Sequence, residues 1–208
     1  MIQKKGAEWI RETAASLRIA AVSLVVLGGI YPVLLGGLGK AVVPSAAAGW
    51  LVRDAAGAVV GSALMAQKFS RPEYFWPRPS AVDFNASAAG GSNLPPGSPD
   101  LAARVKARIA ELGGTTANPV PVDLLAASGS GLDPHITLAG AEFQIDRVAA
   151  ARRLEPAILR DWLRAWSRAR REGRGQAPLV NVLGLNRTLD ERFGRPPVAA
   201  APARKEAR

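Results

Sequence analysis

The 208-residue sequence contains no cysteine and only one histidine. The absence of cysteine excludes a disulfide framework, thiolate metal sites and thiol nucleophiles, and one histidine leaves few ligands for zinc or iron. Aromatic residues make up only 6% and are not interleaved with basic residues, which argues against a base-stacking surface despite the net charge of +10. Arginine supplies 21 of the 27 basic residues in an alanine-rich sequence, a bias that a GC-rich genome would also produce. We therefore expect no metal, no directly bound cofactor and no nucleic-acid partner.

Long apolar runs without a charge are also absent, with one exception at residues 19–39. At a rise of about 1.5 Å per residue, a helix over these 21 residues would cross the roughly 30 Å hydrocarbon layer of a bilayer. A signal peptide has a shorter apolar region of about 7 to 15 residues, although SAAA at 45–48 resembles a cleavage site. A retained membrane anchor is therefore the favoured interpretation.

Basic residues are distributed unevenly around this run. Lys4, Lys5, Arg11 and Arg18 precede it, and Lys40 and Arg53 follow closely. Because basic flanks stay in the cytoplasm, this bias predicts a cytoplasmic N-terminus and an extracytoplasmic remainder. The predicted organisation is a cytoplasmic N-terminus (1–18), a transmembrane helix (19–39), one extracytoplasmic α+β domain (40–193) and a disordered tail (194–208).

Small residues recur within the predicted membrane helix. Gly29 and Gly36 are seven positions apart, so they lie on one stripe where another helix could approach closely. Glycine is also simply common in membrane helices, and the sequence leaves both interpretations open. Pro32 lies between them and predicts a kink.

Both strands and helices are expected after the anchor, which indicates the α+β class. Two β-rich runs over 50–69 indicate a hairpin, and residues 70–99 are rich in proline and predict a long loop. A helix is expected from Pro99, capped by Ser98, and an extended segment over 118–125. A second helix, capped by Thr137, should continue to about Arg153, and a third should start at Pro156 with an apolar face formed by Ile158, Leu159, Trp162, Leu163 and Trp166. A strand over 180–185 and a short helix to about Phe193 complete the expected elements.

Ser128, Ser130, Asp133 and His135 have the side chains of a hydrolytic triad. They are crowded into a glycine-rich turn, and no GxSxG elbow flanks either serine. We therefore favour a turn with locally bonded hydroxyls, and a membrane-anchored extracytoplasmic serine hydrolase is the alternative.

Two further features have open interpretations. The arginines of 152–174 predict a solvated helix face, or a surface for lipid headgroups or an acidic partner; they are Arg152, Arg153, Arg160, Arg164, Arg168, Arg170, Arg171 and Arg174. The GGSN segment at 90–93 is either a binding loop that uses backbone amides or an ordinary turn.

Several segments together resemble the KdpC family, whose members belong to the Kdp potassium-transporting ATPase. They are YP at 31–32, GSALMAQKF at 61–69, YFWPRPSA at 74–81, GGSNL at 90–94, VPVDLLAASGSGLDPHI at 120–136, RVA at 147–149 and VNVLGLN at 180–186. The polar residues of these motifs are the candidate interaction or structural positions: Gln67, Arg78, Ser80, Ser92, Asn93, Asp123, Ser128, Ser130, Asp133, His135, Gln144, Arg147, Asn181 and Asn186.

The resemblance implies a non-catalytic, single-pass inner-membrane subunit with a periplasmic domain. Its partners in the Kdp ATPase would be the channel-like KdpA, the ATP-hydrolysing KdpB and the small KdpF, and ATP and potassium would be handled by the complex. The family is described as a catalytic chaperone that raises the ATP affinity of KdpB. An extracytoplasmic domain cannot touch cytoplasmic ATP, so such an effect would pass through the membrane helices. On physical grounds we favour a stabilising and gating cap over the extracytoplasmic potassium entrance of KdpA. A basic, membrane-tethered interaction domain without a pump is a further interpretation.

Overall fold

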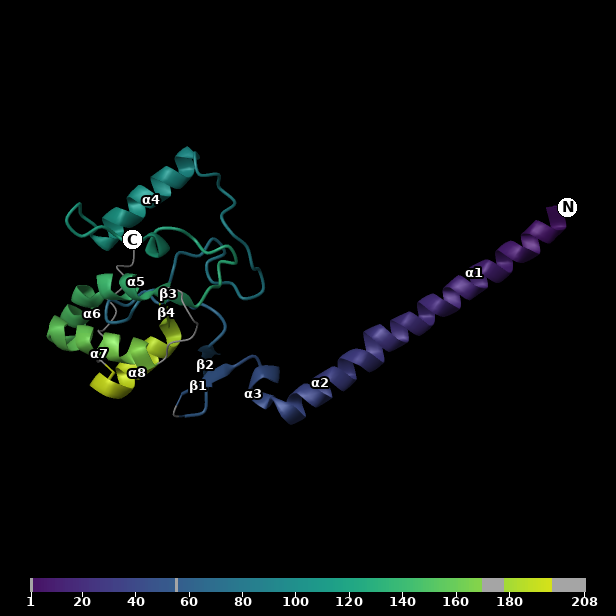
Figure 1. The fold of residues 1–208 in the computed structure, drawn as a ribbon, viewed down its shortest axis with the longest axis horizontal. Coiled ribbons are helices and arrows are strands. Elements are labelled where there is room, and N and C mark those ends of the chain that lie inside the picture. The colour runs from purple at the N-terminus through teal and green to yellow at the C-terminus, as the bar shows by residue number, and fades with distance from the viewer. Residues whose placement is uncertain (1, 55, 170–177, 196–208) are drawn as a thin grey trace, which may run out of the picture. The chain divides into compact units, whose positions relative to one another are not determined.

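The computed structural model describes residues 2–54, 56–169 and 178–195. The chain divides into two compact units, Met1–Leu51 and Val52–Arg208 (Figure 1). Most of the tail expected to be disordered, 196–208, lies outside the described residues, as do Arg170, Arg171 and Arg174.

The first unit is helical throughout most of its length. It comprises α1 (Ile2–Val25), a π-helical turn η1 (Val26–Ile30), α2 (Tyr31–Val42) and the short α3 (Pro44–Ala47). In the part of the chain that the structure describes, Trp9–Val42 is the one helix long and apolar enough to cross a membrane, with a mean hydropathy of 2.2 and no buried residues in that window. This single N-terminal apolar helix agrees with the prediction, and residues 19–39 lie inside it.

The irregularity expected at Pro32 takes the form of the π-helical turn. The Tyr31 N–H bonds to the carbonyl of Val26, five residues earlier, and Pro32 follows in the first turn of α2. Proline has no N–H and its ring clashes with the carbonyl four residues back, so the regular hydrogen-bond pattern must be rearranged at this point.

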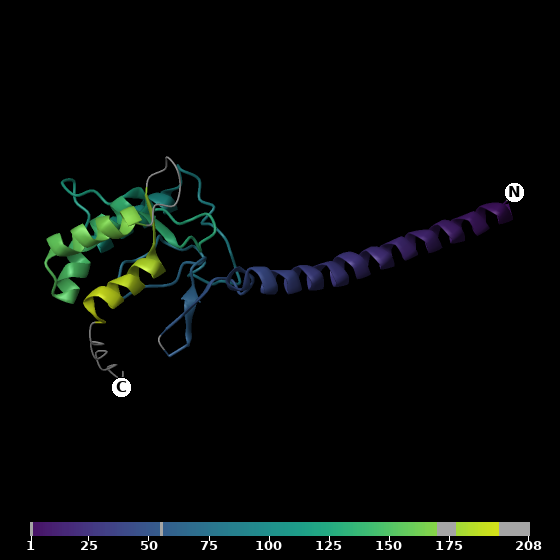
Figure 2. The same ribbon diagram turned by 60° about the horizontal axis from the view of Figure 1, so that its bottom comes forward.

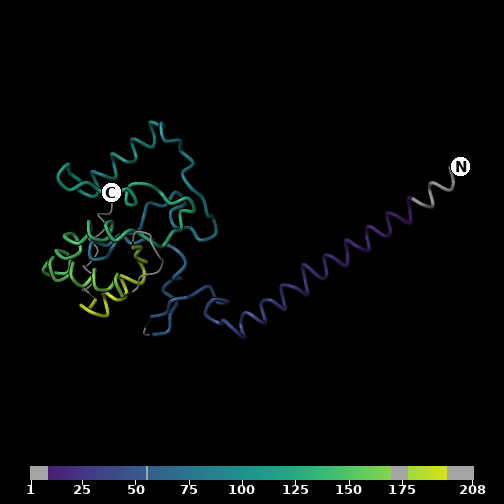
Figure 3. Tube along the Cα trace, viewed as in Figure 1, coloured from purple at the N-terminus to yellow at the C-terminus, as the bar shows by residue number. Residues whose placement is uncertain are grey.

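The second unit begins with the expected hairpin, formed by β1 (Leu51–Arg53) and β2 (Val59–Ser62). The second strand is shorter than its apolar run predicts, because the Ser62 hydroxyl accepts the Leu64 N–H and the chain turns. Residues 63–98 contain no helix or strand, which confirms the predicted long loop; Figure 3 shows its irregular path.

The rest of this unit mixes helices with one small ribbon and confirms the α+β class. Its elements are α4 (Pro99–Leu112), the 3-10 turn η2 (Val122–Leu124), β3 (His135–Thr137), α5 (Leu138–Phe143), α6 (Ile145–Arg152), α7 (Pro156–Ala169), β4 (Leu179–Asn181) and α8 (Val182–Phe193). Strands β3 and β4 are antiparallel, with Ile136 opposite Val180.

Two predicted helix starts are confirmed, although one lacks its expected side-chain cap. The α4 helix begins at Pro99, but the Ser98 side chain makes no capping hydrogen bond, and the helix ends at Gly113, whose φ of 70° suits a residue without a side chain. The Thr137 hydroxyl accepts the Gly140 N–H and caps α5.

Other expectations were wrong. The helix predicted to continue to Arg153 is divided at Gln144 into α5 and α6. The strand predicted over 180–185 ends at Asn181, because the Asn181 side chain accepts the Gly184 N–H and begins α8. An apolar run of this length is compatible with either a strand or a helix, and the Asn181 cap favours the helix.

The remaining corrections are local. A 3-10 turn replaces part of the extended segment expected over 118–125. Ile158, expected on the inner face of α7, is 55% exposed, whereas Leu159, Leu163 and Trp166 are buried as predicted.

The core is formed by buried side chains of α5, α6, α7 and α8 together with Ile136 of β3 and Val180 of β4, and Figure 2 shows the green and yellow helices of this part of the chain lying close together. One loop residue, Phe75, is fully buried within this core. The loop over 63–98 is therefore anchored to the domain at its centre.

Candidate functional site

The buried polar side chains of the domain gather around the loop segment that contains Phe75. Asn186 in α8 bonds both backbone groups of Phe75: the Phe75 N–H donates to Oδ1 and Nδ2 donates to the Phe75 carbonyl, both at 2.9 Å. Gln144, between α5 and α6, does the same for Trp76, at 2.7 and 3.1 Å. Both amides are only 2% exposed, so they satisfy loop groups that have no strand partner and no access to water.

Arg147 in α6 completes this arrangement. Its guanidinium donates to the carbonyls of Pro72 at 2.6 Å and Tyr74 at 3.0 Å, and to Oε1 of Gln144 at 2.6 Å. The guanidinium carbon lies 3.9 Å from the centroid of the Trp76 ring. Burial, with a smaller effect of the Arg108 charge, lowers the pKa of Arg147 to about 10, so it is still a cation at neutral pH. The site thus uses a charge to hold backbone and an aromatic ring.

A second buried arginine, Arg152, holds the same loop one turn further along the helix. It donates to the Glu73 carbonyl at 2.7 Å and to Asp190 at 2.6 Å, and its side chain is 2% exposed. Asp190 also accepts the Tyr74 hydroxyl at 2.9 Å. Burial and this hydrogen bond raise the pKa of Tyr74.

Sequence reasoning missed Asp190 and placed Arg152 on a solvated face. Arg152 is instead enclosed, while Arg160 and Arg164 stay near the surface and pair with Asp146 at 3.6 Å and Glu142 at 2.6 Å. No local signal identifies Asp190, because Arg152 lies 38 residues away in the sequence. The ion pairs reduce the net positive charge that the arginine cluster presents to lipid or an acidic partner.

The two glycine-rich motifs are neighbours through their backbones. The Gly90 N–H donates to the Ser130 carbonyl at 2.8 Å, and the Ser130 hydroxyl accepts the Leu132 N–H at 3.1 Å. Gly131 has a φ of 69°, and a Cβ there would lie 2.9 Å from the Gly90 carbonyl oxygen. The close approach therefore requires glycine at this position.

The histidine and its neighbours form a local group. The Asp133 carboxylate accepts the backbone N–H of His135 at 3.0 Å and pairs with Arg78 at 3.1 Å. The ring atom Nδ1 of His135 lies 3.4 Å from the same carboxylate. In the structure as described, neither Ser128 nor Ser130 hydrogen-bonds to His135. The base is therefore not placed to activate either hydroxyl, as a hydrolytic triad requires.

Other candidate residues fasten one segment to another. Asp123 accepts the N–H of Thr137 at 2.7 Å, and Asn181 donates to the Ala63 carbonyl at 2.8 Å. The Ser80 hydroxyl accepts the Phe84 N–H at 2.9 Å. The Gln67 amide bonds to β2, with its nitrogen 2.9 Å from the Val60 carbonyl and its oxygen 3.2 Å from the Ser62 nitrogen.

The last candidates occupy less enclosed positions. Ser92 borders a surface hollow, and Asn93 has a φ of 52° in the GGSN turn. In the first unit, Gly29 and Gly36 have no atom within 4 Å of the place where a Cβ would be. Within the described ranges, no group of three His, Asp or Glu side chains could hold a metal ion.

The helix and the site together define an α+β protein with one N-terminal helix long and apolar enough to cross a membrane, and with buried polar residues that fix a long loop onto a helical core. Comparison with known proteins then places the chain in a family. A family model described as "K+-transporting ATPase, c chain" (KdpC) matches residues 13–191. The chain therefore belongs to the KdpC family.

Individual relatives agree over most of their length. The KdpC subunit of the potassium-transporting ATPase from Parvibaculum lavamentivorans is 45% identical over 178 residues, which cover 85% of this chain and 94% of the relative. The corresponding protein from Sorangium cellulosum is 49% identical over 186 residues (85% and 97%), and that from Synechocystis is 42% identical over 190 residues (88% and 100%).

Proposed function

We propose that the chain is the accessory, non-catalytic subunit of an ATP-driven potassium-uptake complex, in which it stabilises assembly with KdpA, KdpB and KdpF. The observation that carries this proposal is the family match over residues 13–191, which includes most of the apolar helix and nearly all of the folded domain. The internal use of the polar residues supports a structural rather than a catalytic role for them. Asn186, Gln144 and Arg147 are occupied by the protein's own backbone.

The proposed location is the inner membrane, with the N-terminus in the cytoplasm and the domain in the periplasm. The support for this orientation is the excess of Lys and Arg before residue 19. Alkaline phosphatase requires the oxidising side of the membrane, so fusing it after Gly114 should give an active enzyme in a bacterial host. A reporter that works only in the cytoplasm serves as the control. Its activity at the same position, with an inactive phosphatase, would contradict the orientation.

With this orientation, the chain would influence ATP binding in KdpB only by coupling through the membrane helices. Such coupling typically changes affinity by about 5- to 150-fold, corresponding to about 1 to 3 kcal/mol. The same domain, bound over the potassium entrance of KdpA, would stabilise the assembled complex from the periplasmic side of the membrane.

Purification of the complex through a tag on this chain tests the proposal. KdpA and KdpB should co-purify, and removing the chain should raise the KM of the remaining complex for ATP at least fivefold. Fluorophosphonate labelling provides the control for the hydrolase alternative, and we expect no adduct on Ser128 or Ser130. A full yield of active complex without this chain, or an adduct that the Ser128→Ala and Ser130→Ala changes abolish, would contradict the proposal.

A further inference from the structure

Two hollows in the domain, of about 390 and 290 Å³, adjoin along one face of α4. Pro79, Arg108 and Glu111 border both of them, so the two hollows are neighbours, and together they are called the α4 groove here. The polar side chains around Phe75 are occupied by the backbone of the loop. Among the described residues, none of these polar side chains fills the α4 groove.

One wall of the α4 groove is rigid. Trp76 lines it, and this residue is fixed by the Gln144 amide through its backbone, by Arg147 at 3.9 Å over its ring and by a hydrogen bond of 3.0 Å from its indole N–H to the Arg71 carbonyl. Pro77 and Pro79, on the same wall, have a fixed φ. A rigid surface loses little conformational entropy when it binds a partner.

The other wall belongs to α4, which has no fully buried residue. Leu101 and Ala107 of α4 line the smaller hollow together with Leu125 and Ala127. Near its C-terminal end the helix packs on the core through Ile109 and Leu112. The N-terminal half of α4 therefore has an apolar side that the domain itself does not cover.

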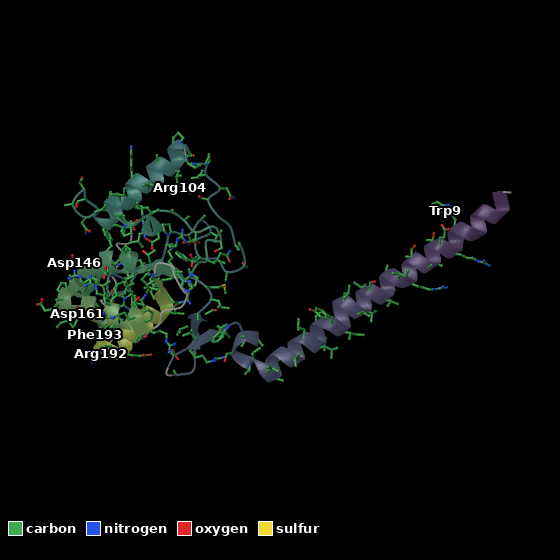
Figure 4. The ribbon with its side chains drawn as sticks, viewed as in Figure 1. Trp9, Arg104, Asp146, Asp161, Arg192 and Phe193 are labelled. Carbon is green, nitrogen blue, oxygen red and sulfur yellow. The ribbon has the colours of Figure 1, made fainter. Side chains whose placement is uncertain are left out.

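Most cations around the α4 groove already have a carboxylate partner. Lys68, Arg78, Arg104 and Arg108 line it, and Arg78 pairs with Asp133 at 3.1 Å. Arg104 is exposed on α4 (Figure 4). Among the described side chains it has no ion pair, whereas Arg108 pairs with Glu111 at 2.8 Å.

The pair of Lys68 with Asp83 is weakly held. Their side chains are 62% and 77% exposed, and an exposed pair of this kind contributes about 0 to 1 kcal/mol. An incoming carboxylate can therefore replace Asp83 at little cost. The α4 groove complements a segment that is both apolar and acidic.

We infer that the α4 groove binds an extended segment of another protein of the complex, in which an apolar side chain is flanked by aspartate or glutamate. The apolar side chain would occupy the hollow beside Trp76, and a carboxylate would pair with Arg104. This inference rests on the proposed function, because the partner is another component of the same complex.

A photo-crosslinking residue in the full-length chain, within the assembled complex, tests the inference. Benzoylphenylalanine in place of Ala107, which lines the groove and leaves Arg104 intact, should crosslink to an acidic segment of one partner protein, at a yield at least tenfold above that from position 106. Lys106 is the control because it is exposed on α4 but does not line the groove, and as a cation it also matches Arg104 in charge.

Charge reversal gives an independent measurement. Arg104→Glu should reduce the yield of assembled complex at least tenfold, and Lys106→Glu should leave it unchanged. Equal crosslinking from both positions, a crosslink only to lipid, or a wild-type yield with Arg104→Glu would overturn the inference while the complex still assembles. Failure of the wild-type chain to assemble with the pump proteins would instead overturn the proposed function, and the inference with it.

Discussion

Replacing Asn186 by Leu should lower the free energy of unfolding of the domain by about 3 kcal/mol or more. The change leaves the N–H and carbonyl of Phe75 without partners, and each unsatisfied buried group costs about 1 to 3 kcal/mol. For a domain of this size, the midpoint of thermal unfolding falls by about 2 to 4 °C per kcal/mol, so a decrease of roughly 6 to 12 °C is expected. Near-ultraviolet circular dichroism of the full chain in detergent would follow it.

Asn118 provides the matched control because it is an exposed asparagine in the same domain. Asn118→Leu should shift the midpoint by less than about 2 °C, since surface substitutions usually change stability by about 0.5 kcal/mol or less. Equal midpoints for Asn186→Leu and the wild-type chain would show that the buried amide does not hold the loop.

Changing both Gly29 and Gly36 to Leu should abolish assembly without preventing insertion. Leucine is more favourable than glycine in hydrocarbon, so the anchor still enters the membrane. Apart from the backbone of the helix and the adjacent residues, no atom of the described chain lies within 4 Å of either added Cβ, so the extra bulk would point toward what surrounds the helix. If a partner helix approaches there, the yield of assembled complex should fall at least tenfold, and potassium-limited growth should fail.

Gly37 offers the control for added bulk. It also has open space around it, but it lies about 100° around the helix from Gly36. Gly37→Leu should preserve the yield of complex that Gly36→Leu reduces. A wild-type yield from the variant with both Gly29 and Gly36 changed would leave the folded domain as the docking element.

The two predictions rest on features that differ in how well the sequence alone reveals them. The glycine positions were visible in the sequence because helical spacing alone places residues seven apart on one face. The sequence identified Asn186 only as a polar residue within a recognisable motif, and not as a residue that bonds to the loop. Its partner Phe75 lies 111 residues earlier, so no local pattern links the two.

Several features followed from the sequence alone because their causes act within a few residues. The length of an uncharged run set against the thickness of a bilayer predicted the apolar helix. Pro99 after Ser98, and Thr137 before an apolar stripe, marked helix starts through the geometry of one turn. The motifs also identified the family, which the comparison confirmed.

Tertiary structure decided the rest, because a buried polar side chain acquires its role from whatever packing brings against it. Arg152 is a surface residue by helical pattern, yet the loop and Asp190 close over it. The run after Asn181 fits a strand or a helix by composition, and the cap together with burial of Leu185 and Leu189 makes it helical. Capping residues and local periodicity determined where several helices begin, because these causes act within one turn. Contacts between distant segments determined which polar residues hold the domain together.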